Sequence, residues 1–269
     1  MHYPPVPEQS PSAAERQTHA GAGLQPANGP VRVWGLIPCA GQGSRAAAPV
    51  AKQYRVVAGQ PLVLHTIAAF AKVPRIEQTL VIVAHGDSFL QTCDNPHPGR
   101  WSVRACGGAH RAGSVANGLA ALRELGAQAD DWVLVHDAAR CLVTPALIEH
   151  LISACWQDPV GGLLAHPVTD TLKRAHDGRV VATPPRSLHW LAQTPQMFRC
   201  EMLRHALSVG GEQVSDESSA IELLGLSPLL VPGDVANFKV TFAPDFAIAQ
   251  AILLQRAGSG PKEMDYDYP

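Results

Sequence analysis

The chain has 269 residues, of which 46% are hydrophobic, and its formal net charge at pH 7 is -2. A chain so close to neutral has no long-range field to attract nucleic acid or an acidic membrane surface, so we expect neither as a partner. No apolar run reaches the roughly 20 residues that a membrane helix needs. Six cysteines without a CxxC pair indicate reduced thiols, a cytoplasmic location and no zinc site.

The composition divides the chain into three parts. Residues 1–30 are rich in proline, glycine, alanine, glutamine and serine, which predicts a disordered N-terminal extension. We expect one domain over residues 31–257 and a flexible tail over 258–269.

Within the domain, short apolar runs alternate with segments of helical periodicity. The predicted strands cover residues 31–41, 79–85, 131–140 and 160–168, and the predicted helices 60–73, 111–125 and 145–155. Because the strands are apolar throughout and helices separate them, the sequence predicts an α/β fold with a doubly wound, mostly parallel sheet.

The alternation stops at residues 169–199, where the Asp177-Gly178 turn signal joins two β-prone segments. We expect this stretch to protrude from the domain as a β-arm. Helices are expected again at 200–210, 215–225 and 244–257, and strands at 227–233 and 238–244. Ser215 suits the N-cap of the second of these helices, with Asp216 and Glu217 in its first turn.

The first predicted strand runs into the loop "PCAGQGSRAAAPVAKQY", residues 38–54. It is not a dinucleotide fingerprint, because Ala46 stands where the third glycine is needed and no acidic residue follows about 20 residues on. It also lacks the G-K-[ST] of a Walker loop. Gly41 and Gly43 would let backbone N–H groups approach phosphates, and Arg45 and Lys52 would oppose charge that grows on a polyphosphate in the transition state. An ordinary strand-to-helix turn with solvated basic residues accounts for the loop alone equally well.

Polar side chains also follow the third predicted strand, in "HDAAR". Asp137 is a candidate Mg²⁺ ligand, because Mg²⁺ prefers one or two carboxylates together with substrate phosphates. A helix-cap aspartate is the alternative. Arg140 suits either an anionic substrate or a surface salt bridge. His136 would face the opposite side of the strand from Asp137, which favours a structural histidine, and Cys39 lacks a nearby base that could make it a nucleophile.

Taken together, the motifs resemble those of the 2-C-methyl-D-erythritol 4-phosphate cytidylyltransferases. "PCAGQGSR…AKQY", "GGAHRAGSV", "VLVHDAAR", "VTDTLKR", "HWLAQTPQMF", "SDESSAIE" and "FKVT" occur in the order and approximate spacing of that family. The resemblance implies a Rossmann-like nucleotidyltransferase fold and transfer of CMP from CTP, the co-substrate, to 2-C-methyl-D-erythritol 4-phosphate, with release of pyrophosphate. It also implies Mg²⁺ or another divalent cation. The acceptor phosphate is already ionised, so the reaction requires no general base.

The resemblance assigns roles position by position. It implies the catalytic residues Arg45, Lys52, Arg186 and Lys239; the CTP-binding residues Cys39, Ala40, Gly41, Gly43, Gly108 and Ser114; the acceptor-binding residues Arg140, Thr171, Thr194 and Ser215; and the metal ligand Asp137. It also implies a homodimer in which the β-arm crosses over, so that Thr171 and Arg186 serve the neighbouring subunit's site.

Some positions depart from the family pattern. Cys39 stands where alanine is usual and Ala51 where proline is usual, so we expect a less rigid loop around CTP. A cytidylyltransferase acting on ribitol 5-phosphate is the alternative within this fold, and "HDAAR" favours the methylerythritol branch by one residue. A nucleotide-binding module without turnover is the alternative from another class, although it would not need Arg45 and Lys52 together.

Overall fold

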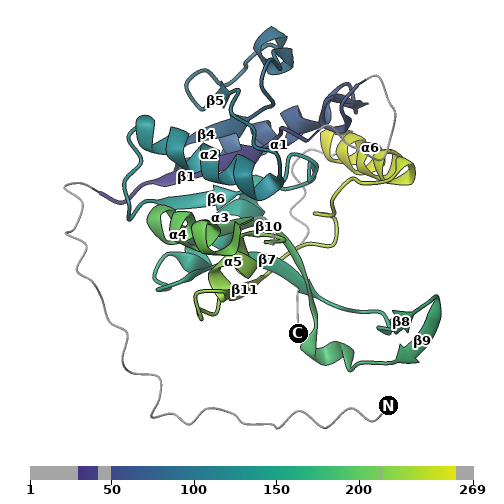
Figure 1. The fold of residues 1–269 in the computed structure, drawn as a ribbon. Coiled ribbons are helices and arrows are strands. Elements are labelled where there is room, and N and C mark those ends of the chain that lie inside the picture. The colour runs from purple at the N-terminus through teal and green to yellow at the C-terminus, as the bar shows by residue number, and fades with distance from the viewer. Residues whose placement is uncertain (1–29, 42–49, 212–213, 259–269) are drawn as a thin grey trace.

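The computed structural model describes residues 30–41, 50–211 and 214–258. The predicted N-terminal extension, apart from residue 30, lies outside them, as does the tail beyond residue 258. The centre of the molecule is a seven-stranded sheet in the order β11-β7-β10-β6-β1-β4-β5 (Figure 1). Its strands are β1 Val33–Pro38, β4 Ile76–Ile82, β5 Trp101–Arg104, β6 Trp132–Val135, β7 Gly161–Pro167, β10 Trp190–Arg199 and β11 Leu229–Pro232.

The sheet is mostly parallel, as the sequence predicts. β1 pairs in parallel with both β4 and β6, β4 with β5, and β7 with β11. Only β10, among the strands of this sheet, runs antiparallel to its neighbours β6 and β7. The strands are apolar on both sides because helices cover both faces of the sheet.

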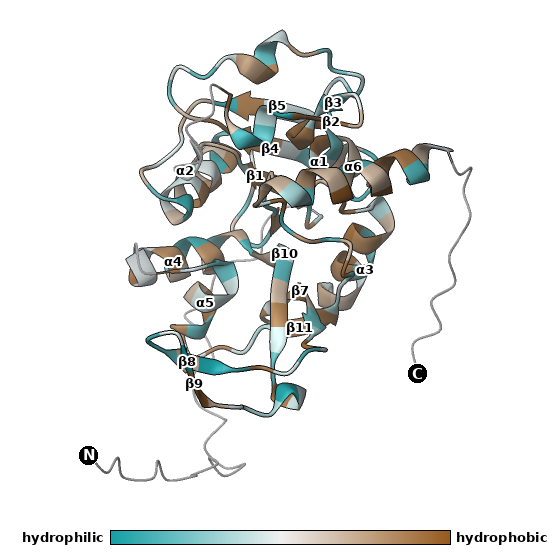
Figure 2. Ribbon diagram, turned by 90° about the vertical axis from the view of Figure 1, so that its right-hand side faces the viewer, coloured by the Kyte–Doolittle hydropathy of each residue, from teal (hydrophilic) through white to brown (hydrophobic). Residues whose placement is uncertain are grey.

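Helices lie on the two sides of the sheet in Figure 2, with α2, α4 and α5 on one side and α1 and α3 on the other. Their bounds are α1 Leu62–Ala71, α2 Arg111–Glu124, α3 Pro145–Cys155, α4 Cys200–Gly210 and α5 Glu217–Glu222. One apolar core forms where Val115 and Leu203 pack toward the sheet, and a second where Phe70 and Leu151 do so on the opposite face. The chain is therefore a three-layer α/β structure.

Local sequence explains where α3 begins. Thr144 is its N-cap, and the Thr144 hydroxyl accepts a hydrogen bond of 3.2 Å from the Leu147 backbone N–H. Pro145 occupies the first helical position, where the missing N–H costs nothing. In α5 the structure corrects the prediction by one residue, since Asp216 rather than Ser215 is the N-cap and forms a capping box with Ser219.

The predicted arm contains a hairpin of β8 (Arg174–His176) and β9 (Arg179–Ala182), which projects from the body of the molecule in Figure 1. Asp177 and Gly178 both have positive φ, 49° and 73°, and make the tight turn that the sequence signals. The prediction carried the arm to residue 199, and this end is wrong: β10 is a strand of the central sheet. Its backbone N–H and C=O groups find partners between β6 and β7, so the return segment belongs to the core.

Two further elements differ from the prediction. β5 was not expected, because only four residues form it. The strand expected at 238–244 is absent: that segment is irregular up to α6 (Ala243–Gly258), which packs on the small β2 (Val56–Val57) and β3 (Gln60–Pro61) hairpin. The Val240 N–H donates instead to the carbonyl of Ala139, in the loop after β6, at 2.9 Å. The segment is thus fixed by single contacts to loops rather than by a ladder.

Candidate active site

A cavity of about 820 Å³ opens at the carboxyl ends of β1 and β6. This is where open α/β sheets bind ligands. The structure brings together there the following residues predicted from the sequence: Cys39, Ala40, Gly41, Lys52, Gly108, Ser114, Asp137 and Lys239. Gly43 and Arg45 lie outside the described residues.

The loop that follows β1 is held by Gln53, the residue after Lys52. The Gln53 side-chain amide donates hydrogen bonds of 3.0 Å to the carbonyls of both Cys39 and Gly41. Gln53 is buried, so these bonds are shielded from water. They turn the carbonyls of the loop toward Gln53 and fix the backbone that enters the cavity.

The opposite wall of the cavity is the segment before α2. A Cβ atom on Gly107 would lie 2.3 Å from the Cβ of Ala40, so glycine is required for the two walls to approach. The Gly108 N–H donates to the Ser114 hydroxyl at 3.0 Å, and that hydroxyl donates in turn to the His110 carbonyl at 3.2 Å. Ser114 therefore shapes the loop from its place in the first turn of α2.

Asp137 is the centre of charge in the cavity. Its Oδ1 lies 2.9 Å from Arg111 Nε, and its Oδ2 lies 2.9 Å from Lys239 Nζ and 3.8 Å from Arg140 Nε. Burial alone would raise the pKa of Asp137, but Arg111 and Lys239 outweigh it and hold the pKa well below its usual range. The group is a carboxylate at every pH at which the protein would work.

Arg140 lies directly behind this carboxylate. Its Nη1 donates to the Asn237 carbonyl at 2.8 Å and its Nη2 to the Ala192 carbonyl at 3.3 Å. Its buried Nε has no hydrogen-bond partner in the structure. The guanidinium thus ties β10 to the segment before α6 and leaves one N–H beside Asp137.

His136 is buried on the other side of β6, as predicted. His136 Nε2 donates to the Arg140 carbonyl at 3.1 Å, because a carbonyl can only accept. In the neutral ring Nδ1 is then the acceptor, so the Thr194 hydroxyl donates to it at 3.0 Å while accepting from the Asp137 N–H, also at 3.0 Å. Burial lowers the pKa of His136 to about 4, so the ring is neutral at pH 7 and orders the backbone around Asp137.

The segment at residues 237–240 contacts both lysines of the cavity. It supplies Lys239, which reaches Asp137, and its Val240 carbonyl accepts from Lys52 Nζ at 2.8 Å. Asn237 anchors the segment: its Nδ2 donates to the Thr194 carbonyl at 2.8 Å and to Gln193 Oε1 at 3.2 Å. The geometry concentrates positive charge around one carboxylate in a cavity of nucleotide size, a surrounding that suits a polyphosphate.

Comparison with known proteins decides the family. The family model of the 2-C-methyl-D-erythritol 4-phosphate cytidylyltransferases matches residues 33–255. The chain belongs to this family. It is therefore a nucleotidyltransferase that transfers the cytidylyl group of CTP to 2-C-methyl-D-erythritol 4-phosphate, and the alternative of a ribitol 5-phosphate cytidylyltransferase is not favoured.

Curated relatives agree. The chain is 51% identical over 237 residues to the 2-C-methyl-D-erythritol 4-phosphate cytidylyltransferase of Paraburkholderia phytofirmans, covering 85% of this chain and 98% of that one. It is 58% identical over 236 residues to the bifunctional enzyme IspD/IspF of Albidiferax ferrireducens, covering 86% of this chain. The chain spans 56% of the length of that bifunctional relative.

Solved structures have the same fold. A crystal structure of 4-diphosphocytidyl-2C-methyl-D-erythritol synthase is 38% identical with a TM-score of 0.74, covering 83% of this chain and 99% of that one. The 2-C-methyl-D-erythritol 4-phosphate cytidylyltransferase of Francisella tularensis is 30% identical with a TM-score of 0.70, covering 82% and 99%. The nucleotidyltransferase fold expected from the sequence is confirmed.

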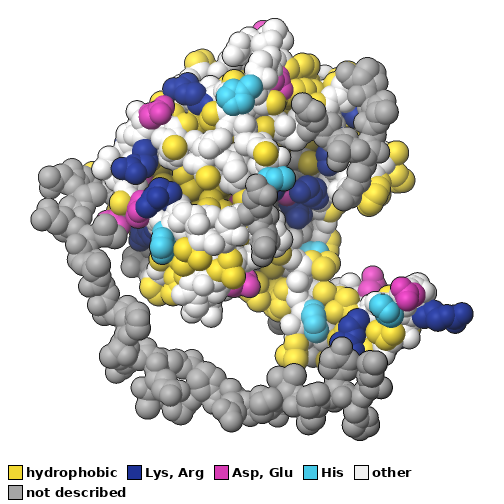
Figure 3. Space-filling model, viewed as in Figure 1, with side chains coloured by type: hydrophobic (Ala, Val, Ile, Leu, Met, Phe, Trp, Pro, Cys, Tyr) yellow, Lys and Arg dark blue, Asp and Glu magenta, His cyan; other side chains and the backbone are white. Residues whose placement is uncertain are grey.

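Three predicted residues of the cytidylyltransferase lie away from the cavity. Thr171 and Arg186 are exposed on the arm, where an Arg186 Nη1–H bonds the Thr169 carbonyl. Ser215 is exposed before α5, and its hydroxyl donates to Ser219 Oγ at 3.1 Å. Figure 3 shows the arm standing off from the body, with hydrophobic side chains among charged ones. Within the described part of one chain, the arm residues and the Asp137 cavity are not assembled into one site.

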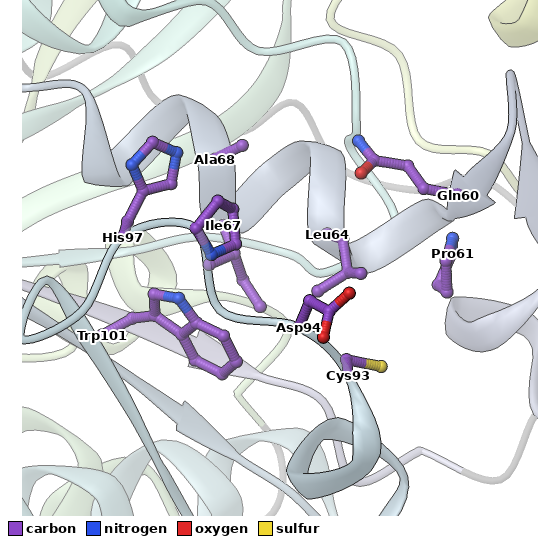
Figure 4. Close-up of a pocket in the computed structure, with 10 residues that line it drawn as sticks. Gln60, Pro61, Leu64, Ile67, Ala68, Cys93, Asp94, His97 and Trp101 are labelled. Atoms are coloured by element: carbon purple, nitrogen blue, oxygen red, sulfur yellow. The ribbon is translucent and has the colours of Figure 1, made fainter.

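The cytidylyltransferase has a second cavity, of about 380 Å³, between α1 and the loop before β5. Figure 4 shows Ile67 of α1 near Trp101 and His97, and Leu64 of the same helix near Asp94 and Cys93. Its lining is mainly apolar and contains none of the residues predicted for CTP or the acceptor.

Sequence reasoning missed Gln53, Arg111 and the role of Glu217. Arg111 is part of the motif "GGAHRAGSV" but was given no role, and Glu217 was expected only to favour the helix start. A signal was present for Arg111: a cation in the first turn of a helix opposes the helix dipole and needs a compensating partner. The identity of that partner depends on tertiary contacts.

Proposed function

We propose that the cavity around Asp137 is the site at which this chain converts CTP and 2-C-methyl-D-erythritol 4-phosphate to 4-diphosphocytidyl-2-C-methylerythritol and pyrophosphate. The observation that carries this proposal is the pairing of Lys239 with the Asp137 carboxylate, with Lys52 lining the same cavity, which is walled by glycine-rich backbone. Positive charge fixed before the reaction stabilises charge that develops in the transition state.

The reaction forms one bond and breaks one. A phosphate oxygen of the acceptor attacks the α-phosphorus of CTP, and the bond from that phosphorus to the bridging oxygen breaks, so the electron pair leaves with pyrophosphate. The attacking oxygen is already ionised, so catalysis needs positioning and charge stabilisation rather than a base. The neutral, fully hydrogen-bonded His136 supports this view, because it is turned away from the cavity.

We assign the backbone of Cys39, Ala40 and Gly41 to one side of the CTP pocket and Gly108 and Ser114 to the other. Gly43 is expected to extend the first side. Lys52, with Arg45, would stabilise the transition state, and the N-terminus of α2 adds partial positive charge beside the phosphates. Residues 42–49 include Gly43 and Arg45 and lie outside the described chain, so their roles rest on the sequence.

Asp137 is the proposed ligand of Mg²⁺ or another divalent cation. No group of three or more His, Cys, Asp or Glu side chains able to hold a metal occurs within residues 30–41, 50–211 and 214–258. A single ionised carboxylate nevertheless fits Mg²⁺, which takes few protein ligands when substrate phosphates supply the others. The cation would neutralise charge on the triphosphate when bound.

The acceptor would be held by Lys239 and Arg140 from this chain, which flank Asp137. Thr194 and Ser215 are the other acceptor contacts expected from the sequence, but the Thr194 hydroxyl is buried behind Asp137 and Ser215 lies outside the cavity. Thr171 and Arg186 would come from a second subunit through the arm. The arm exposes Val180, Val181 and Leu188, and Leu188 is 80% exposed. The first residues of β10, Trp190 and Leu191, are exposed next to it. Apolar side chains at such exposure favour burial against a partner, which supports the homodimer.

We also infer a cytoplasmic enzyme. Each of the six cysteines lies within the described residues and is a free thiol, which suits a reducing compartment. No helix in the described segments is both long and apolar enough to cross a membrane.

The test of this function is pyrophosphate release from CTP and Mg²⁺ with each of two acceptors. We expect release with 2-C-methyl-D-erythritol 4-phosphate and none above background with ribitol 5-phosphate, because the family match favours the first acceptor. Release with ribitol 5-phosphate alone would contradict the proposal. Chelation of the divalent cation should stop the release.

A further inference from the structure

Arg111 joins two buried acids from distant parts of the chain. Its Nε donates to Asp137 Oδ1 at 2.9 Å, while Nη1 and Nη2 donate to Glu217 Oε1 and Oε2 at 2.6 and 3.0 Å. Glu217 is 0% exposed. The bidentate pairing fixes the plane of the guanidinium, so Arg111 can offer Asp137 only its Nε.

Glu217 is itself held in place by its neighbours in α5. Gln196 on β10 accepts from the Ser218 N–H through Oε1 at 2.7 Å and donates to Asp216 Oδ2 through Nε2 at 2.8 Å. The capping box of Asp216 and Ser219 closes the first turn. The carboxylate that grips Arg111 is therefore preorganised by the central sheet, as the supporting shell of a functional site must be.

The two oxygens of Asp137 consequently differ. Oδ1 is bound by the partly buried Arg111, whose burial would lower its pKa but whose two carboxylate partners hold the pKa above its usual range. Oδ2 is paired with Lys239, whose side chain is 44% exposed. A lysine on a flexible stem is a mobile point charge, so it can leave Oδ2 far more readily than Arg111 can leave Oδ1.

We propose that Glu217 is a positioning residue: by engaging the forked end of Arg111, it limits Arg111 to one oxygen of Asp137 and reserves Oδ2 for an exchangeable cation. Lys239 occupies that oxygen in this structure, and the divalent ion that accompanies CTP would replace it. Without Glu217 the fork of Arg111 would turn onto Asp137, because two parallel N–H···O bonds are the preferred arginine–carboxylate geometry. The inference rests on the proposed metal role of Asp137.

The experiment measures the affinity of Mn²⁺ at saturating CTP without an acceptor, from the electron paramagnetic resonance signal of free Mn²⁺. No turnover occurs under these conditions, so the readout is binding alone. We expect Glu217→Gln to weaken Mn²⁺ binding about 10- to 100-fold, the usual effect of losing a residue that orients a metal ligand. Glu222→Gln, on the exposed face of the same helix, is the matched control and should bind Mn²⁺ like the wild type.

The double variant Arg111→Met with Glu217→Gln separates this role from a merely structural one. If the defect arises because the freed Arg111 guanidinium turns onto Asp137, then removing that guanidinium should return the Mn²⁺ affinity close to the wild-type value. Binding as weak as in Glu217→Gln, or weaker, would overturn the inference, as would wild-type binding in Glu217→Gln itself. If Glu217→Gln fails to fold, the double variant decides alone, since it removes both buried charges together: retained Mn²⁺ binding supports the inference and lost binding overturns it.

The variant Asp137→Asn separates the role inferred for Glu217 from the metal-binding role proposed for Asp137. Wild-type Mn²⁺ binding in Asp137→Asn would remove the proposed metal role and the inference with it. Lost binding in Asp137→Asn, together with wild-type binding in Glu217→Gln, would leave the metal role intact and overturn only the part assigned to Glu217.

Discussion

Among single residues, Cys39 is the departure from the family pattern that lies deepest in the site. Its side chain packs with Ile37, Tyr54 and Val81 below the cavity, while its carbonyl accepts from Gln53. Burial raises the pKa of the thiol to about 12. Cys39 therefore contributes its backbone to the site and an inert thiol to the core, and it is not a nucleophile.

We predict that Cys39→Ala keeps kcat and the KM for CTP close to the wild-type values and costs about 1 kcal/mol of unfolding free energy, the value of one small buried group. Iodoacetamide at pH 8 should label Cys93, on the surface loop, before Cys39 in the native protein. Peptide mass spectrometry reads the order of labelling. Early alkylation of Cys39, or a large rise in KM for CTP in Cys39→Ala, would contradict the assignment.

Among the elements, the segment between β11 and α6 does more for the site than its lack of regular structure suggests. It supplies Lys239 to Asp137, the Val240 carbonyl to Lys52 and the Asn237 carbonyl to Arg140. The end of the segment is held by the first turn of α6, where Asp245 Oδ2 accepts from the N–H groups of Thr241 and Phe242 at 2.7 and 2.8 Å. Asn237, which is 0% exposed, joins the segment to β10 by donating to the Thr194 carbonyl, and the buried amide of Gln193 on β10 donates back to the Asp234 carbonyl at 2.7 Å.

We predict that Asn237→Ala lowers the unfolding free energy by about 1–3 kcal/mol, because the Thr194 carbonyl loses its buried donor. It should also lower kcat on the order of tenfold to a hundredfold, since Lys239 would no longer be placed accurately. Urea unfolding and steady-state kinetics measure the two effects. Val235→Ala changes an exposed side chain on the same segment and should leave both quantities unchanged. A variant with lost stability but wild-type kcat would show that the segment does not position Lys239.

At the scale of the whole molecule, the Asp137 cavity lies at the carboxyl ends of the central strands, while the arm places Arg186 away from it. β8 and β9 pair with each other in a two-stranded sheet of their own, and the central sheet begins again at β10. A two-fold dimer would let each arm complete the partner's cavity, because the same surfaces then meet twice.

We predict that Lys52→Ala and Arg186→Ala proteins, each nearly inactive alone, recover activity when their subunits are mixed after unfolding and refolding together. In an equal mixture about a quarter of wild-type activity is expected, since half of the dimers are mixed and each of these has one intact site. Differently tagged subunits and tandem purification verify the mixing. Verified mixed dimers that stay inactive would mean that each site is built from one chain.

The sequence by itself determined the class of fold and most of the cavity. An apolar run that ends in glycine predicted β1, and an apolar run that ends in polar residues predicted β6. The polar motifs after these two runs predicted Asp137 and the loop before Lys52. These features are local, because hydrophobic period and turn chemistry act over a few neighbouring residues. The same locality explains the errors: a strand such as β10 joins the sheet through partners that its own residues do not specify.

Only the tertiary structure decided how the charges are paired. Arg111 meets Asp137 across 26 residues of chain and Glu217 across 106, and Lys52 meets the Val240 carbonyl across 188. Ion pairing and hydrogen bonding depend on distance in space, and no local pattern records which acid a given arginine will reach. The sequence therefore supplied the charged groups of the site. The fold determined that Arg111 holds one oxygen of Asp137 and that the more mobile Lys239 is paired with the other.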